Sequence, residues 1–132
     1  MASFSTLEEA KDFFKGDRFA GVNGMQIDEL GEDWCVCSMI LNEDHRNAYG
    51  GVMGGVTFTL ADFALGVTAN QIHTLSVAQQ ADIHYLNAPK GDRLTARSRC
   101  IKDGKSTAVI DVDISDDTGR LIAQVVGTAF KL

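Results

Sequence analysis

The segment from Gly54 to about Gln71 constrains the fold most strongly, because it leaves almost no polar side when drawn on a helical wheel. Its apolar positions are Val56, Phe58, Leu60, Ala61, Phe63, Ala64, Leu65 and Val67. A helix that is apolar around its whole circumference must be covered by the rest of the protein. The sequence therefore predicts one long central helix that other elements surround.

The remaining segments supply that cover mainly as β-strands. Alternating, β-rich segments follow the helix at 74–88, 92–102, 106–115 and 120–131, separated by turn-forming residues, and they predict a four-stranded antiparallel meander. Two further strands, around Met25–Ile27 and 34–41, precede the helix and are joined by a turn at 31–33. A capping box, with Ser5 or Thr6 before Glu8 or Glu9, predicts a short helix over 6–15 followed by a brief turn. We expect an α+β fold over 1–132 as a single domain, with a curved antiparallel sheet wrapped around the central helix.

Charge and composition exclude several classes of partner. The 18 acidic residues exceed the 12 basic ones, which gives a net charge of −6 and argues against binding to nucleic acid or to anionic membranes. The start of the chain lacks the pattern of a secretory signal, and the most apolar stretch, Gly50 to Ala69, contains five glycines and Asp62, which argues against a membrane span. Three cysteines, an odd number, are typical of reduced, buried thiols. We expect a cytoplasmic protein.

The sequence does not predict a metal site. Cys35 and Cys37 have no second ligand pair at the usual spacing, and no two histidines have metal-ligand spacing. His45 and His84 are predicted to be surface or strand residues, and His73 lies just past the central helix.

One residue conflicts with the buried helix. Asp62 is the only formally charged residue between Arg46 and Asp82, and it lies in the middle of the apolar segment. An ionised carboxylate with little access to water tends to have a raised pKa, which suits a general base or nucleophile. The alternative is structural: Asp62 lies with Thr59 and Gly66 on a narrow polar strip that faces solvent or a partner subunit.

The glycines before the helix allow two interpretations. Gly54 and Gly55 mark the helix N-terminus, where unpaired amides and the helix dipole can stabilise an oxyanion. The alternative is close packing of the backbone at that end. The glycines do not match the phosphate-binding patterns of P-loop or Rossmann proteins.

These two features belong to one longer pattern. Asn47-Ala-Tyr-Gly-Gly-Val-Met-Gly-Gly55 followed by Phe58-Thr-Leu-Ala-Asp62 resembles the motif of hotdog-fold acyl-CoA thioesterases of the phenylacetate-pathway (PaaI-like) type, which reads N-x-x-G-x-x-H-G-G and then L-A-D on a helix. The resemblance continues at 83–89, 91–92, 116–121 and 127–128, and so covers nearly the whole chain.

The resemblance implies catalytic roles. Asp62 would be the base or nucleophile, the Gly54 amide would polarise the thioester carbonyl beside Gly55, and Asn47 would position water or the carbonyl. There are two departures from the family: Met53 stands where histidine is usual, and Ala78 stands where relatives often carry a hydroxyl. Methionine can fill the volume of histidine but cannot donate its hydrogen bond. Gln79 or Gln80 could supply a polar group instead.

The family also binds coenzyme A along a groove between subunits. The matching positions run from Tyr85 to Lys90 and from Lys102 to Thr107, and the candidate substrate-binding residues there are Tyr85, Asn87, Lys90, Lys102, Gly104, Lys105 and Ser106. The lysines could meet phosphates, although each could equally be an ordinary solvated hairpin lysine. Coenzyme A is part of the substrate, and no separate cofactor is expected.

The function that the resemblance implies is hydrolysis of a small-to-medium acyl-CoA thioester, aromatic ones included, by a homodimer or dimer of dimers. The first alternative is a non-catalytic module of the same fold that binds acyl-CoA or an acyl carrier. A hydratase or dehydratase is disfavoured because the Asp-His arrangement of that branch is not evident. A structural oligomer would leave Asp62 unexplained.

Overall fold

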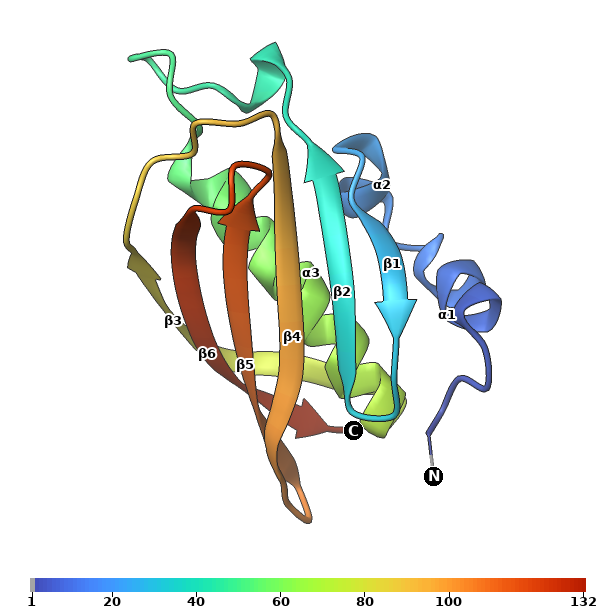
Figure 1. Ribbon diagram of the computed structural model, residues 1–132. Helices are drawn as coiled ribbons and strands as arrows, with labels where there is room; N and C mark the ends of the chain where they lie inside the picture. The colour runs from blue at the N-terminus through green and yellow to red at the C-terminus, as the bar shows by residue number, and fades with distance from the viewer. Residues whose placement is uncertain (1) are drawn as a thin grey trace.

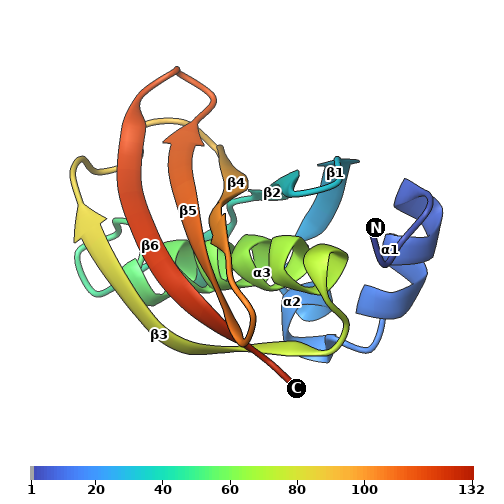
Figure 2. The same ribbon diagram turned by 90° about the horizontal axis from the view of Figure 1, so that it is seen from below.

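The computed structural model describes residues 2–132 and contains a six-stranded antiparallel sheet with one long helix packed against it (Figure 1). In chain order, the helices and strands are α1 (Leu7–Phe14), α2 (Arg18–Val22), β1 (Gln26–Leu30), β2 (Trp34–Ile40), the short 3-10 helix η1 (Glu43–His45), α3 (Gly54–Ile72), β3 (Ser76–Tyr85), β4 (Arg93–Asp103), β5 (Thr107–Asp116) and β6 (Leu121–Lys131). Seen from below, the sheet curves around α3 (Figure 2). The predicted fold class is confirmed.

The core lies between α3 and the concave face of the sheet. Leu60, Ala64 and Leu65 on the helix are fully buried, as are Ile110 and Val112 on β5. Cys35 and Cys37 also lie in this core, as predicted, with their sulfur atoms 3.8 Å apart, whereas Cys100 on β4 is only half-buried, which corrects the prediction for the third thiol. Burial of branched apolar side chains on both sides of this layer is the main source of stability for such a fold.

The predicted four-stranded meander is wrong for its first strand. The strand order is β1-β2-β4-β5-β6-β3, so β4, β5 and β6 form a meander, whereas β3 pairs with β6 at the far edge. The cause is α3, which carries the chain across the face of the sheet from β2 to that edge. The chain then returns, and β4 pairs with β2.

The N-terminal region contains one helix more than the sequence predicts. In α1, the Thr6 side chain accepts a hydrogen bond from the Glu9 amide, and the Glu9 carboxylate accepts one from the Ser5 amide, as the capping pattern suggested. The expected turn after Gly16 is instead the short helix α2, whose N-terminus is capped by Asp17 through the Ala20 amide at 3.0 Å.

One face of α3 remains uncovered, which corrects the prediction of burial on all sides. Asp62 and Gly55 are exposed, and Thr59 and Gly66 are half-buried, so these four residues form a stripe along the helix that the sheet does not cover. We call it the α3 stripe. In the single chain, Asp62 therefore lies on the polar strip that the structural alternative described.

Among residues 2–132, no helix is long and apolar enough to cross a membrane.

Candidate functional site at the N-terminus of α3

The N-terminus of α3 presents two amides with no acceptor. Met53 is the N-cap, but its side chain makes no capping hydrogen bond, and within residues 2–132 no acceptor is paired with the amides of Gly54 and Gly55. The surrounding backbone is well fixed: the Met53 amide donates to the His45 carbonyl at 2.9 Å, and the Val56 amide to the Met53 carbonyl at 3.0 Å. Unpaired amides at the positive end of a 19-residue helix can stabilise a negative oxygen.

Tyr85 explains why position 54 is a glycine. Its hydroxyl donates to the Gly54 carbonyl at 2.9 Å, and a Cβ added at Gly54 would lie 3.1 Å from the Tyr85 ring and hydroxyl. The close packing predicted for this end of the helix is therefore present at Gly54. It leaves the amide of the same residue available, so the packing and oxyanion interpretations do not exclude each other.

Asn47 shapes the loop in front of the helix. Its side-chain oxygen accepts hydrogen bonds from the amides of Tyr49 at 2.9 Å and Gly51 at 3.1 Å, which closes the loop around Gly50, whose φ is +82°. Asn47 lines a cavity of about 370 Å³. The structure thus brings four of the predicted site residues together around this cavity: Asn47, Gly54, Tyr85 and Asn87.

A second cavity, of about 290 Å³, lies on the other side of the helix terminus. Predicted residues Met53 and Gly55 border it, together with elements that the sequence did not connect with the site. Its lining residues are Phe19, Asn23, Met25, Asp44, His45, Met53, Gly55, Val56 and Thr59. We call it the α2 cavity.

His45 is not the surface residue that the sequence predicted. It is buried, its Nδ1 accepts a hydrogen bond from the Asn42 amide at 3.0 Å, and its Nε2 lies 3.2 Å from Asn23 Oδ1. Because Nδ1 accepts, Nε2 must carry the proton and donate to Asn23. The polar run around His45 predicts a solvated loop, whereas the imidazole ties that loop to the end of α2.

Asp62 is exposed, yet its surroundings favour the protonated form. Partial burial against the protein, and then the negative charge of Asp17, raise the pKa of the Asp62 carboxyl above its ordinary value. Eight residues separate Asp62 from Gly54 on α3, which is ~12 Å along the helix axis. The structure therefore does not bring these two predicted residues together within one chain.

The sequence interpretation did not single out Asp116 as a site residue and named it only among the turn-forming residues and within the 116–121 stretch of the family resemblance. Its two carboxylate oxygens accept hydrogen bonds from the amides of Lys90, Gly91, Thr118 and Arg120 and from the Thr118 hydroxyl, at 2.6–3.1 Å. Burial alone would raise the pKa of Asp116, but these hydrogen bonds lower it below its usual range. The carboxylate thereby holds the loop after Asn87, which forms one wall of the larger cavity.

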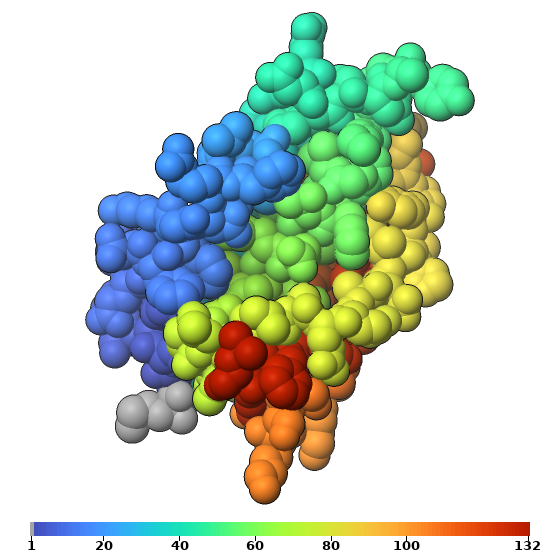
Figure 3. Space-filling view, turned by 180° about the vertical axis from the view of Figure 1, so that it is seen from behind, coloured from blue at the N-terminus to red at the C-terminus, as the bar shows by residue number. Residues whose placement is uncertain are grey.

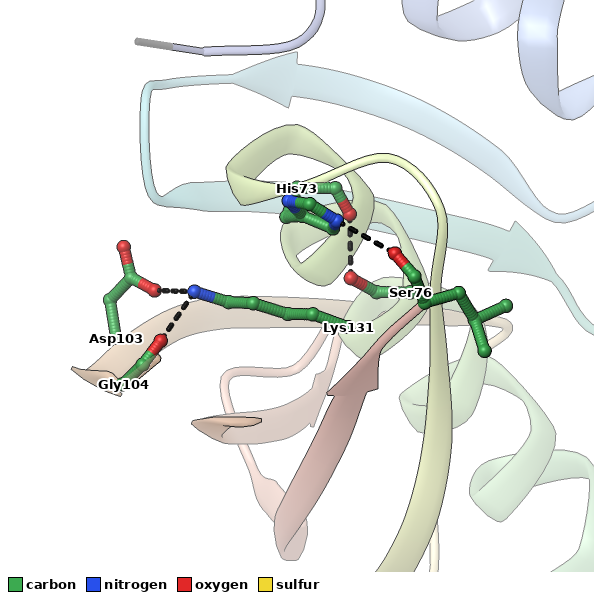
Figure 4. A network of polar contacts seen from close by, with 6 residues as sticks. His73, Ser76, Asp103, Gly104 and Lys131 are labelled. Atoms are coloured by element: carbon green, nitrogen blue, oxygen red, sulfur yellow. Dashed lines mark hydrogen bonds and ion pairs between the residues drawn. The ribbon is translucent and has the colours of Figure 1, made fainter. Parts of the chain in front are cut away.

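Five further predicted substrate-binding residues lie elsewhere. Lys102, Gly104, Lys105 and Ser106 belong to the β4–β5 hairpin at the opposite end of the sheet, and exposed Ala78 lies near the start of β3 (Figure 1). In that region Lys131 bonds to Asp103 and to the Gly104 carbonyl, as Figure 4 shows. Within one chain the hairpin does not join the site at Gly54.

A curved sheet around one helix, with open amides at the helix N-terminus, defines a hotdog-fold protein with a candidate acyl-transfer site. A model of the thioesterase superfamily matches residues 49–123, which include both Gly54 and Asp62. The chain belongs to the thioesterase superfamily, as a thioester hydrolase of the PaaI-like type.

Three similarities support this placement. The acyl-coenzyme A thioesterase PaaI of Escherichia coli is 27% identical over 98% of this chain and 94% of its own. The solved structure of E. coli PaaI has a TM-score of 0.89 and 25% identity, covering 95% of this chain and 91% of that one. A thioesterase protein from Streptococcus pneumoniae, solved with coenzyme A, has a TM-score of 0.82 and 30% identity, covering 89% of this chain and 94% of that one.

Proposed function

We propose that the protein hydrolyses a small-to-medium acyl-CoA thioester to the free acid and coenzyme A. The observation that carries this proposal is the pair of open amides at Gly54 and Gly55, placed between two cavities. Similarity to an acyl-coenzyme A thioesterase and to a structure with coenzyme A supports the choice of substrate. Coenzyme A belongs to the substrate, and the proposed reaction uses no further cofactor.

The chemistry follows from the polarity of these groups. The thioester carbonyl oxygen accepts a hydrogen bond from the Gly54 amide, which stabilises the negative charge that develops during attack. Asp62 either deprotonates a water molecule or attacks the carbonyl carbon itself. When the carbon–sulfur bond breaks, the coenzyme A thiolate leaves and takes up the proton that Asp62 removed from water. On the direct route, water then hydrolyses the anhydride between the acyl group and Asp62, which releases the free acid and supplies that proton. A raised pKa makes the Asp62 carboxylate a stronger base than an ordinary aspartate.

We propose that each site is completed by a second copy of the chain. Because ~12 Å separates Gly54 from Asp62 along α3, one thioester cannot contact both in a single chain. A two-fold axis would set the Asp62 of one subunit against the Gly54 of the other. The single chain leaves two suitable surfaces open: the α3 stripe and the outer edge of β3, which bears exposed Val77 and Tyr85.

The same arrangement would let the β4–β5 hairpin of one subunit reach the site of another. The hairpin lies far from Gly54 in its own chain, so Lys102, Lys105 and Ser106 can contact coenzyme A only across a subunit boundary. Lys90 and Asn87 would bind from the chain that supplies Gly54. We propose a homodimer or a dimer of dimers for this reason.

A thiol-release assay tests the function. We expect turnover on a panel of acetyl-, medium-chain and arylacetyl-CoA esters, and a loss of ~10²- to 10⁴-fold in Asp62→Asn, which keeps the shape but removes the base. Asp113→Asn, at an exposed position of the otherwise largely buried strand β5, is the matched control and should retain wild-type turnover. Tight binding of the esters without thiol release would instead identify the non-catalytic acyl-CoA-binding module.

Mixed subunits test the shared site. Asp62→Ala and Gly54→Pro should each inactivate the homodimer, whereas a mixed dimer contains one site with both groups intact. Proline is tolerated at the first position of a helix, and Met53 before it already has the extended ψ of 133° that a following proline favours. Partial recovery of activity is expected. Folded mixed dimers that remain inactive would contradict the shared site. They would not affect the assignment as a hydrolase, which the thiol-release assay decides separately.

A further inference from the structure

We propose that His45 is a positioning residue, which tethers the loop in front of α3 to α2 and so holds that loop in the arrangement that turnover requires. This inference rests on the proposed function and adds a residue to its site. The loop comprises residues 42–53, and we call it the η1 loop because it contains η1. It carries Asn47 and ends at Met53, the N-cap before the open amides of α3.

The η1 loop projects from the molecule with little packing of its own. In the space-filling view it forms the teal top of the molecule, beside the blue region of α2 and above α3 in green (Figure 3). His45, which is 2% exposed, is the only buried residue from 42 to 53, and residues 46–51 are all exposed. Because so little of the loop is covered by apolar contacts, its position depends on hydrogen bonds.

Most hydrogen bonds of the η1 loop stay within it. The Asn47 side chain accepts from the amides of Tyr49 and Gly51, and the His45 carbonyl accepts from the Met53 amide at 2.9 Å. Bonds of this kind give the loop a shape but move with it. They therefore do not fix the loop relative to the rest of the fold.

One hydrogen bond connects the loop to another part of the fold. Among residues 2–132, the bond from His45 Nε2 to Asn23 Oδ1, at 3.2 Å, is the only one that joins the loop to a residue outside the loop and α3. Asn23 is itself fixed as the C-cap of α2, since its backbone amide and its side-chain amide both donate to the Phe19 carbonyl. His45 thus ties the η1 loop to α2.

The geometry of His45 carries this tie to the end of α3. Its Nδ1 accepts from the Asn42 amide at 3.0 Å, which sets the orientation of the ring and leaves the proton on Nε2. Its carbonyl holds the Met53 amide, next to the open amides of α3. A misplacement of site groups by about 1 Å can lower a rate by ~10²-fold, so a loosened tether should reduce kcat.

Substitutions that keep one hydrogen bond at a time test the tether. The side-chain nitrogen of glutamine lies as many bonds from Cβ as Nε2 of histidine, and the side-chain oxygen of asparagine as many as Nδ1. His45→Gln can therefore keep the bond to Asn23, whereas His45→Asn can keep only the bond from Asn42. We expect kcat to fall about tenfold in His45→Ala and His45→Asn, with KM little changed, and His45→Gln to retain most of the wild-type kcat. Ala48→Ser, at an exposed position of the same loop, is the control and should leave kcat unchanged.

The partner residue provides an independent variant. Asn23→Ala removes the same hydrogen bond from the side of α2, and it replaces His45→Ala in the test if that variant does not fold. Because both changes remove one bond, the double variant should lose no more kcat than His45→Ala alone. Losses that add up would overturn the tether.

Amide hydrogen exchange separates this inference from the proposed function, because it needs no turnover. The segment that contains Met53 should exchange faster in His45→Ala and His45→Asn than in wild type and His45→Gln, with β5 unchanged. Unchanged exchange in folded His45→Ala would overturn the tether, whatever the value of kcat. Faster exchange with an unchanged kcat would give His45 a purely structural role and overturn its positioning role. Absent thiol release by wild type, with the exchange differences intact, would overturn the proposed function but leave the tether established.

Discussion

The two ends of α3 differ in whether their polar groups have hydrogen-bond partners within the chain. At the N-terminal end, the amides of Gly54 and Gly55 are open and cavities lie on both sides. At the C-terminal end, the His73 carbonyl accepts from the Ser76 hydroxyl, and the His73 ring bonds to the carbonyl of Leu132 (Figure 4). The side chain of Lys131 is likewise paired there with Asp103.

This difference indicates that the N-terminal end of α3 can bind a ligand, whereas the C-terminal end stabilises the fold. Polar groups that the fold itself pairs stabilise the chain and have little left to offer a ligand, whereas open donors at a helix terminus cost stability unless water or a ligand bonds to them. The N-terminal end of α3 is also where the family motif lies. Substitutions at that end should therefore change activity more than stability. The exceptions are residues that hold the walls of the cavities in place, whose substitution should lower stability.

Asp116 is such a wall residue, and its replacement should have the largest effect on stability. Asp116→Ala removes five hydrogen bonds to one carboxylate, and we expect the free energy of unfolding at pH 7 to fall by about 3 kcal/mol. Because the pKa is lowered in the folded state, this stabilisation exists above the unfolded pKa of about 3.9 and is lost as the pH falls below it.

Urea unfolding at pH 7 and at pH 3 measures this effect. The difference between wild type and Asp116→Ala should be smaller at pH 3. Asp113→Ala, on the same strand but exposed, should change the unfolding free energy by less than about 0.5 kcal/mol. Equal stability of wild type and Asp116→Ala at pH 7 would mean that the loop after Asn87 is held by other contacts.

Gly54→Ala tests the open end of the helix directly. The new methyl group would press on the Tyr85 ring and hydroxyl at 3.1 Å, so we expect Tyr85 to move and kcat/KM to fall about tenfold with the fold retained. Gly21→Ala adds a methyl group on α2 where no atom lies within 4 Å, and should leave kcat/KM unchanged. Equal activities for the two variants would show that Tyr85 does not position the substrate.

The sequence predicts those parts of the fold that depend on local pattern. The capped first helix, the apolar central helix and the strand segments are all confirmed, because periodicity and turn residues determine them. The place of β3 at the far edge is not predicted, since strand order depends on the path that α3 takes across the sheet. The short helix α2 has no periodicity long enough to recognise.

The candidate site, like the fold, was predicted only where local sequence determines it. The motif predicts residues near one another in sequence, and Asn47 and Gly54 do line one cavity. Asp62 looks buried in the sequence because its neighbours are apolar, but it lies on the α3 stripe, which the chain itself leaves uncovered. His45 and Asp116 act through tertiary hydrogen bonds to distant segments, which no local pattern reveals.

The β4–β5 hairpin, at the end of the sheet far from Gly54, provides a test with a smaller expected effect. If the hairpin binds coenzyme A across a subunit boundary, Lys102→Ala and Lys105→Ala should each raise KM for acyl-CoA about two- to fivefold, with kcat unchanged, because an exposed charge contributes little. The effect should shrink at high salt. Lys11→Ala on α1 is the control. An unchanged KM at low salt would leave the far end of the sheet purely structural.

The smallest expected effect concerns the charge beside Asp62. Because the negative charge of Asp17 contributes to the raised pKa of Asp62, Asp17→Asn should lower that pKa and move the acidic limb of the kcat/KM profile to lower pH. Asparagine can still accept the hydrogen bond from the Ala20 amide, so α2 should remain capped. Both groups lie near solvent, and partial burial is the larger cause, so we expect only a small shift to lower pH. The profile should be measured at low ionic strength, with Asp12→Asn on α1 as the matched loss of one negative charge. A shift of equal size in both variants would assign the effect to net charge, whereas a shift in Asp17→Asn alone would identify Asp62 as the group that titrates.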